Sequence, residues 1–208
     1  FIAIHKKKKE VIEILIDNNA KINEVDKYGN TTLMAAINNR DIDTINLLLQ
    51  KGADIDAQDN DGWNALIFAI KNGNKEIVEM LIKNEADVNI ASSDDSTALM
   101  TASSEGHIEI VKILIAAGAN IELANEDGWN ALLLACYYNN VEIIKLLVEN
   151  KAELNNFNIE NLNALMLATR NENKEIIQLL IEKGCNINAT NKNGLRALQI
   201  AATSENKE

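Results

Sequence analysis

The chain has 208 residues, of which 47% are hydrophobic and 25% are charged, and this composition is that of a globular protein rather than a disordered one. Its formal net charge of −11 disfavours nucleic acid and anionic lipid as partners, because both bind to positive surfaces. No apolar run reaches the roughly 18 residues that a membrane-spanning helix needs. The composition therefore favours a basic or neutral protein as partner, with neither nucleic acid nor membrane.

The chain opens with "FIAIHKKKKE", in which the basic run follows the apolar residues. A signal peptide has the opposite order, so we do not expect one. We expect "KKKK" at residues 6–9 to be an exposed loop that favours solubility, with a nucleic-acid patch or a localisation signal as the alternative. Because no initiator methionine is present, we expect the chain to be a fragment of a longer protein.

The stretch "GWNAL" occurs twice, at residues 62–66 and 128–132. A similar stretch, "DSTAL" (95–99), stands halfway between the two copies, which predicts a repeat with half of their spacing as its period. Steps of the same length in both directions reach "GNTTL" (29–33), "NLNAL" (161–165) and "GLRAL" (194–198). The first position is Gly, Asn or Asp in every copy, and these residues tolerate a positive φ. The pattern predicts a turn that recurs with this constant period, without insertion or deletion.

A short helix is predicted after each turn. Its expected N-cap residues are Thr31, Asn64, Thr97, Asn130 and Asn163, and these are types that favour this position. A Leu-x-x-Ala pair follows in each copy and predicts core positions, with the small alanine allowing close helix packing. The pairs are Leu33/Ala36, Leu66/Ala69, Leu99/Ala102, Leu132/Ala135, Leu165/Ala168 and Leu198/Ala201.

A second helix is predicted in each copy from apolar residues at positions i, i+1, i+3, i+4 and i+5, as in "IVEMLIKNEADVN". It ends at a glycine in half of the copies, where a left-handed cap is expected. Asn19, Glu85 and Lys151 stand at the equivalent places in the others. Glu85 and Lys151 should each cost about 1 kcal/mol in that conformation. We expect the segment from Glu85 to Asp95 to be the loosest junction, because it has no glycine at either the cap or the turn.

This unit of turn, short helix and second helix resembles the ankyrin repeat. The family motif Gly-x-Thr-Pro-Leu-His-x-Ala is similar to six stretches of this chain. They are "GNTTLMAA" (29–36), "GWNALIFA" (62–69), "DSTALMTA" (95–102), "GWNALLLA" (128–135), "NLNALMLA" (161–168) and "GLRALQIA" (194–201). The proline position is always Thr or Ala and the histidine position is Met, Ile, Leu or Gln. We expect apolar packing to replace the polar bracing that those two family residues provide.

The resemblance implies an all-α solenoid of stacked helix-turn-helix units with short β-hairpin-like turns. We expect one array over residues 1–208, in which a partial repeat stands at each end. The predicted boundaries are 1–25, 26–58, 59–91, 92–124, 125–157, 158–190 and 191–208.

The sequence offers no constellation that predicts catalysis. "HIE" at 107–109 is similar to half of a zinc deaminase motif, but the Pro-Cys-x-x-Cys half is missing, so we expect His107 to begin a second helix. His5 has no partner motif, and Cys136 and Cys185 lack the spacing of metal ligands. We expect no enzyme activity, no cofactor and no metal. The two cysteines are expected to be reduced thiols, which favours a cytoplasmic location.

The family resemblance implies a concave binding face formed by the turn tips and the first helices. Trp63 and Trp129 occupy the same slot, directly after the turn glycine, and face this groove in our interpretation. They either anchor a partner or brace the stack. Leu162 and Leu195 in the same slot predict an apolar row that a partner covers.

The predicted partner is a basic, partly apolar peptide or protein, because aromatic faces and carboxylates both attract cations. We favour a monomer. The alternatives are a targeting or regulatory segment of a larger enzyme or effector protein, and a structural spacer. The candidate partner-binding residues are Tyr28, Asp61, Trp63, Lys71, Asp94, Glu105, Asp127, Trp129, Tyr137, Tyr138, Leu162, Arg170 and Leu195.

Overall fold

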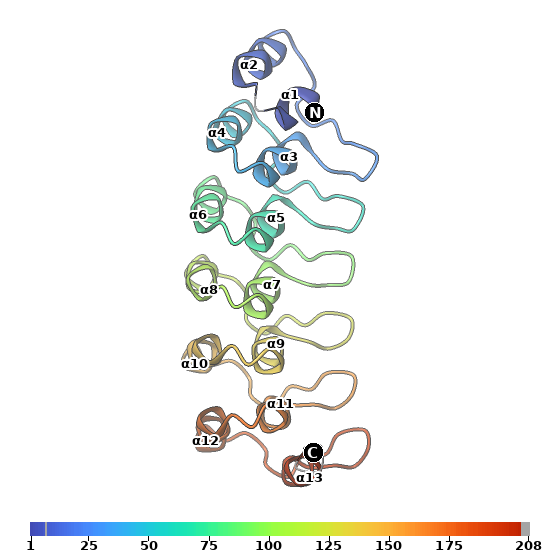
Figure 1. The fold of residues 1–208 in the computed structure, drawn as a ribbon, viewed down its shortest axis with the longest axis vertical. Helices are drawn as coiled ribbons and strands as arrows, with labels where there is room; N and C mark the ends of the chain where they lie inside the picture. The colour runs from blue at the N-terminus through green and yellow to red at the C-terminus, as the bar shows by residue number, and fades with distance from the viewer. Residues whose placement is uncertain (7, 205–208) are drawn as a thin grey trace. The chain divides into compact units, whose positions relative to one another are not determined.

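The computed structural model describes residues 1–6 and 8–204 and divides into two compact units, Phe1–Ala98 and Leu99–Glu208. Each unit consists of short helices that follow one another in pairs (Figure 1). In the first unit these are α1 (Ile2–His5), α2 (Lys9–Asp17), α3 (Thr32–Asn38), α4 (Ile42–Gln50), α5 (Ala65–Lys71) and α6 (Lys75–Lys83). In the second they are α7 (Ala98–Ser104), which starts at the boundary, α8 (Ile108–Ala116), α9 (Ala131–Tyr137), α10 (Val141–Glu149), α11 (Ala164–Arg170), α12 (Lys174–Glu182) and α13 (Ala197–Ser204).

The helices recur with the period that the sequence predicts. In the first unit, α3 and α5 start at Thr32 and Ala65. In the second unit, α7, α9, α11 and α13 start at Ala98, Ala131, Ala164 and Ala197, and the step from one start to the next is constant. The all-α repeat fold is therefore confirmed. The exact repeat boundaries, and a single array over the whole chain, stay our proposal.

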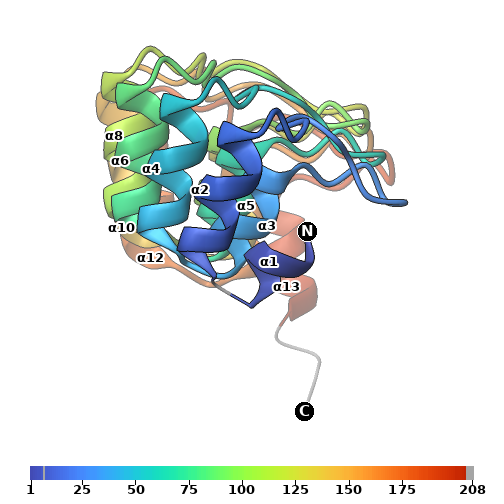
Figure 2. The same cartoon turned by 90° about the horizontal axis from the view of Figure 1, so that it is seen from above.

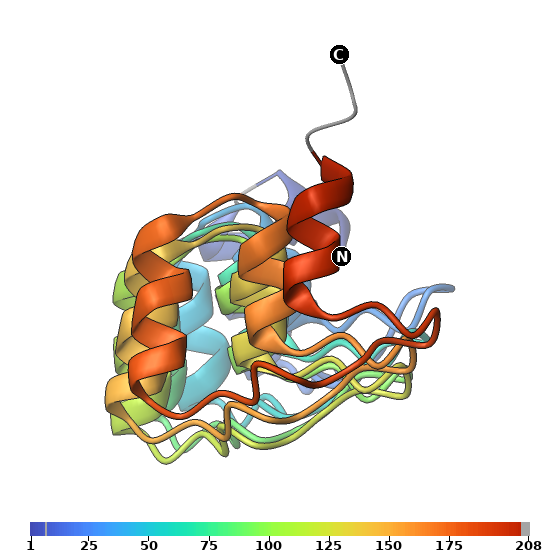
Figure 3. The ribbon, with the colours of Figure 1, turned by 90° about the horizontal axis from the view of Figure 1, so that it is seen from below.

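Each unit has two layers of helices. In the first unit, α1, α3 and α5 form one layer and α2, α4 and α6 form the other, and the extended turns project beyond the first of these layers (Figure 2). The second unit repeats this arrangement, with α9, α11 and α13 beside the turns and α10 and α12 in the outer layer (Figure 3). No helix of the described residues has both the length and the apolar character that crossing a bilayer requires.

Four of the first helices, α3, α5, α9 and α11, begin directly after a predicted cap residue. The side chains of Thr31, Asn64, Asn130 and Asn163 each accept a hydrogen bond from the backbone N–H three residues later, at 3.2, 3.0, 2.9 and 2.9 Å. Such a cap contributes about 1 kcal/mol to helix stability. These four caps confirm where the helices start.

Five of the six predicted Leu-x-x-Ala pairs are buried, from Leu33 and Ala36 to Leu165 and Ala168. The sixth prediction is wrong, because Leu198 is 79% exposed and Ala201 is exposed as well. They belong to α13, and within the described residues no second helix follows α13 to cover them. A leucine at this position is buried only where a neighbouring helix packs against it.

The turns are held by a polar residue three positions before the turn residue of positive φ, which is glycine in four of these turns and Asn161 in the fifth. Our reading of the sequence missed this feature. Its side-chain oxygen accepts the backbone N–H four residues later, at 2.8–3.0 Å. The residues in this position are Asp26, Asp59, Asn125, Asn158 and Asn191. They recur in register with the turn residues of positive φ, so the period could have revealed them.

Within each unit, backbone hydrogen bonds join successive turns. Asn60 donates its N–H to the carbonyl of Tyr28 at 3.0 Å, and Ile159 donates to the carbonyl of Asp127 at 2.9 Å. Gly62 is required at such a joint, because a Cβ there would collide with the backbone nitrogen of Ser93. The described strand pairing consists of isolated bridges such as the one between Val25 and Thr31, so the turns form no sheet.

The second helices end in the predicted left-handed conformation even where glycine is absent. The φ angles of Asn19, Glu85 and Lys151 are 66°, 66° and 64°, and that of Gly52 is 84°. A side chain in this conformation costs about 1 kcal/mol, so the backbone is strained at Glu85 and Lys151. The cap prediction is confirmed.

Candidate functional site

Three candidate residues of the second unit, Trp129, Tyr137 and Tyr138, form an aromatic cluster. The Trp129 backbone is fixed by Asn125, whose side chain accepts its N–H at 2.9 Å. The Trp129 and Tyr137 rings meet edge to face with centroids 5.3 Å apart, and Tyr137 and Tyr138 do the same at 5.0 Å. Tyr137 is 48% exposed and Tyr138 55% exposed. The cluster thus offers aromatic surface to solvent at the end of α9.

Trp63 has different neighbours in the first unit. Its ring packs edge to face against Phe68 with centroids 5.8 Å apart, and the amine of Lys71 lies 3.5 Å from its centroid. Lys71 and Tyr137 occupy the same slot, eight positions after their tryptophans. The role of Phe68 was missed from the sequence. These contacts favour bracing for Trp63, whereas for Trp129 the two readings stay open.

A groove of about 850 Å³ adjoins the aromatic cluster in the second unit. We call it the C-terminal groove. It is bounded by the turns at 158–162 and 191–195 and by the ends of α9, α11 and α13. Its lining brings together four predicted residues, namely Tyr137, Leu162, Arg170 and Leu195. The other residues of the lining are not among the candidate partner-binding residues, although the repeat register also places Glu160, Asn171, Asn193 and Thr203 on the predicted binding face. They are Glu160, Leu167, Asn171, Glu172, Asn191, Asn193, Ile200 and Thr203.

The predicted exposed apolar row is wrong in one respect. Leu162 is only 4% exposed, whereas Leu195 is half-buried. Leu162 donates its N–H to the Asn158 side chain at 2.9 Å and accepts from the Asn158 N–H at 3.2 Å. The turn is thereby closed with the leucine against the core, where its apolar surface is removed from water. Leu162 forms the floor of the groove instead of a patch on its rim.

The predicted acidic residues are all exposed, and they divide between the units. Asp61 and Asp94 belong to the first unit, and Glu105 and Asp127 to the second. Asp94 is already engaged, because its carboxylate accepts hydrogen bonds from the hydroxyls of Ser92 and Ser96. The Ser92 bond is the main reason why the pKa of Asp94 is lowered from its ordinary value. Asp94 therefore braces its own turn.

The remaining candidate, Tyr28, lies at the tip of the first unit's first turn and is 60% exposed. The amine of Lys27 lies 4.7 Å from its ring centroid. The structure thus places Tyr28, Asp61, Trp63, Lys71 and Asp94 in the first unit and the other eight candidates in the second.

The cysteines and the histidine that we considered as catalytic candidates have structural roles. Cys136 and Cys185 are free and buried, and burial raises the pKa of both thiols, so both stay protonated. His107 is the N-cap of α8, as expected. The described residues contain no group of three or more His, Cys, Asp or Glu side chains that could hold a metal ion.

The lysine run at 6–9 is only partly a loop. Lys6 and Lys8 lie between α1 and α2, as expected, and Lys7 lies outside the described residues. Lys9 is the first residue of α2. Its amine forms an ion pair at 3.6 Å with Asp43 of α4, which belongs to the next pair of helices. The expectation that all four lysines form the loop was wrong for Lys9.

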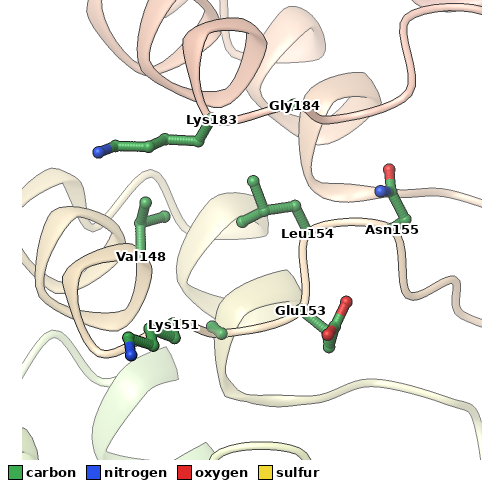
Figure 4. A pocket seen from close by; sticks show the side chains of 8 residues that line it. Val148, Lys151, Glu153, Leu154, Asn155, Lys183 and Gly184 are labelled. Carbon is green, nitrogen blue, oxygen red and sulfur yellow. The ribbon is translucent and has the colours of Figure 1, made fainter.

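A second, smaller hollow of about 250 Å³ lies at the C-terminal ends of α10 and α12. The amines of Lys151 and Lys183 lie on one side of it, Glu153 and Asn155 lie on the other, and Leu154 is between them (Figure 4). Asn155 accepts the N–H of Asn186 at 2.7 Å, so this wall joins successive repeats. No predicted partner-binding residue lines this hollow.

The repeated caps, turns and paired helices agree with a comparison of the sequence with known families. The family described as ankyrin repeats in three copies matches residues 1–92, 89–158 and 154–208. The chain belongs to the ankyrin repeat family. Ankyrin repeats are generally protein–protein interaction modules, and the family is typically non-catalytic. No curated protein matches this ankyrin repeat chain.

Proposed function

We propose that this ankyrin repeat chain is a non-catalytic module that binds a basic, partly apolar segment of another protein on the turn side of its second unit. The observation that carries the proposal is the aromatic cluster, in which Tyr137 and Tyr138 are exposed and Tyr137 also lines the C-terminal groove. Trp and Tyr are enriched among the residues that dominate binding energy in protein interfaces, because they bury much surface at a low entropic cost.

The charge around the cluster supports a basic ligand. Glu105, Glu126 and Asp127 are exposed residues of the same unit, and none of them has an ion pair within the described residues. Carboxylates at turn tips steer cations toward the face, and aromatic rings attract them at short range. Leu162 and Leu195 both line the groove, which supports an apolar contact of the ligand next to the cation.

A structural spacer is the second candidate, and the contacts of Trp63 favour it for the first unit. Phe68 and Lys71 cover this tryptophan, so it stabilises its own repeat. Removal of both tryptophans without loss of any binding would favour the spacer for the whole chain.

The charge of the ligand is tested with two synthetic peptides of equal length, one built from Lys, Leu and Ser and the other with Glu in place of each Lys. We expect the purified chain to bind the Lys peptide more tightly, by isothermal titration calorimetry, and to lose affinity as salt is added. Asp127→Lys should slow association. Glu149→Lys on the outer helix α10 makes the same change of charge away from the cluster and should slow it much less. Tighter binding of the Glu peptide would contradict the proposal.

A further inference from the structure

Arg170 is a cation that stands in the C-terminal groove without a counter-ion. It is the last residue of α11, it is exposed, and it lines the groove together with Tyr137. The described residues contain no ion pair of its guanidinium group, although lysines elsewhere in the unit, such as Lys145, form them. The groove is thus not uniformly suited to a basic ligand, and Arg170 marks the part that repels one.

Two acidic residues line the same groove as Arg170, but neither forms an ion pair with it within the described residues. The backbone of Glu160 is fixed in its turn, where its carbonyl accepts the N–H of Lys192 at 3.0 Å. The backbone of Glu172 is fixed in a left-handed conformation with φ 55°, and its N–H donates to Thr169 at 3.0 Å. Both carboxylates remain exposed and unpaired within the described residues. Their negative charge disfavours a ligand that brings more than one carboxylate to the groove.

The chemistry of Arg170 fits a carboxylate with an apolar neighbour. A guanidinium binds a carboxylate through two parallel hydrogen bonds, which are stronger than bonds between neutral groups. Leu195 and the floor residue Leu162 provide the apolar surface beside it. Tyr137 belongs to both the groove and the aromatic cluster, because it lines the groove and also contacts Trp129 and Tyr138.

We infer that the ligand of the second unit carries three features: a basic residue at the aromatic cluster, an apolar residue over Leu162 and Leu195, and a single carboxylate at Arg170. This inference rests on the proposed function and adds to it a requirement for an acidic group. The carboxylate is a Glu or Asp side chain of the bound segment, and Arg170 is the residue that selects it.

The inference is tested with peptides in the order Lys, Leu, Glu, separated by Ser, and with the same peptides carrying Gln or Lys in place of Glu. Each peptide is used in both chain directions, because the residues that line the groove do not fix the direction of the ligand. We expect the wild-type chain to bind the Glu peptide at least tenfold more tightly than the Gln peptide in one of the two directions.

Variants of Arg170 separate a direct contact from a general effect of charge. Arg170→Ala should remove the preference for Glu over Gln, and Arg170→Glu should transfer the preference to the Lys peptide. Lys183→Ala removes a cation from the second hollow of the same unit and should leave the preference unchanged. Thermal unfolding of each variant checks that the exposed substitution leaves the fold intact.

The outcomes distinguish this inference from the proposed function. Equal affinity of the wild-type chain for the Glu and Gln peptides, together with binding that depends on Trp129, would overturn the inference and leave the proposed function standing. A preference for Glu that survives in Arg170→Ala would overturn it as well. Failure of every Lys-containing peptide to bind would contradict the proposed function and, with it, the inference.

Discussion

The amine nitrogen of Lys71 lies 3.5 Å from the centroid of the Trp63 ring. In the second unit the same slot holds Tyr137, whose ring meets Trp129 at 5.3 Å. Two identical "GWNAL" stretches therefore present their tryptophans differently, because the residue eight positions later covers one with a cation and extends the other with an aromatic ring. The cation site on Trp63 is filled by the chain itself, so a basic ligand is expected at Trp129.

Lys71→Ala should uncover Trp63. In a chain that carries Trp129→Phe, so that Trp63 is the one fluorescent indole, we expect stronger quenching by acrylamide after the substitution. We also expect a loss of about 0.5–1 kcal/mol of stability, which is typical of an exposed cation–π contact. Lys83→Ala on α6 serves as the control. Quenching that is the same in both variants would show that Lys71 does not cover the ring.

Glu85→Gly should stabilise the chain by about 1 kcal/mol, because glycine adopts the left-handed cap without strain. Gly52→Ala is the reverse test, since a Cβ at Gly52 meets no atom within 4 Å and the substitution adds only backbone strain. We expect it to destabilise by a similar amount in urea unfolding. A Glu85→Gly variant that unfolds at or below the parent temperature would contradict this reading of the cap.

Hydrogen exchange should also be fastest at the junction from Glu85 to Asp95.

The stability of the first unit should depend on pH through Asp94 and Asp56, with opposite signs. The Ser92 hydrogen bond lowers the pKa of Asp94 below 3.8, so its contribution is present above that value and is lost as the pH falls through the folded-state pKa. Burial raises the pKa of Asp56 above 3.8, so its contribution is present in acid and is lost as the pH rises through the raised pKa.

Urea unfolding between about pH 2 and 6 checks the sign of both effects. Asp94→Asn should make the loss of stability in acid shallower, and Asp56→Asn should make it steeper. Parallel curves for the two variants would contradict the opposite pKa shifts of Asp94 and Asp56.

Asn158→Ala should cost about 1–3 kcal/mol, because it leaves two turn N–H groups without their acceptor. These are the N–H groups of Glu160 and Leu162, which donate to the Asn158 side chain at 3.0 and 2.9 Å. Asn158→Asp keeps the acceptor and removes an amide nitrogen that has no partner in the structure. Asp59 already has this role in the equivalent turn, so the aspartate variant should lose much less. Thermal unfolding measures both, and equal losses would exclude the acceptor role.

The regular part of the fold could be predicted because it repeats and because its causes are local. Asn64 caps a helix through an atom three residues away, and Glu85 ends one through its own φ angle. Side-chain contacts depend on rotamers and on neighbours that the repeat does not fix. The sequence could not tell that Phe68 would pack against Trp63, that Leu162 would turn into the core, or that Leu198 would remain uncovered. The groove at Arg170 could not be predicted for the same reason, since several turns and helix ends form it together.

The most direct test of the proposed binding face compares two tyrosines of similar exposure, Tyr138 in the aromatic cluster and Tyr28 in the first unit. Binding of the Lys-containing peptide is measured by calorimetry for Tyr138→Ala, Trp129→Ala and Tyr28→Ala, each checked for an unchanged fold. We expect Trp129→Ala to weaken binding by about 2 kcal/mol, Tyr138→Ala to weaken it by more than about 1 kcal/mol, and Tyr28→Ala to leave it unchanged. Equal affinities of the three variants and the parent would contradict a binding site at the aromatic cluster.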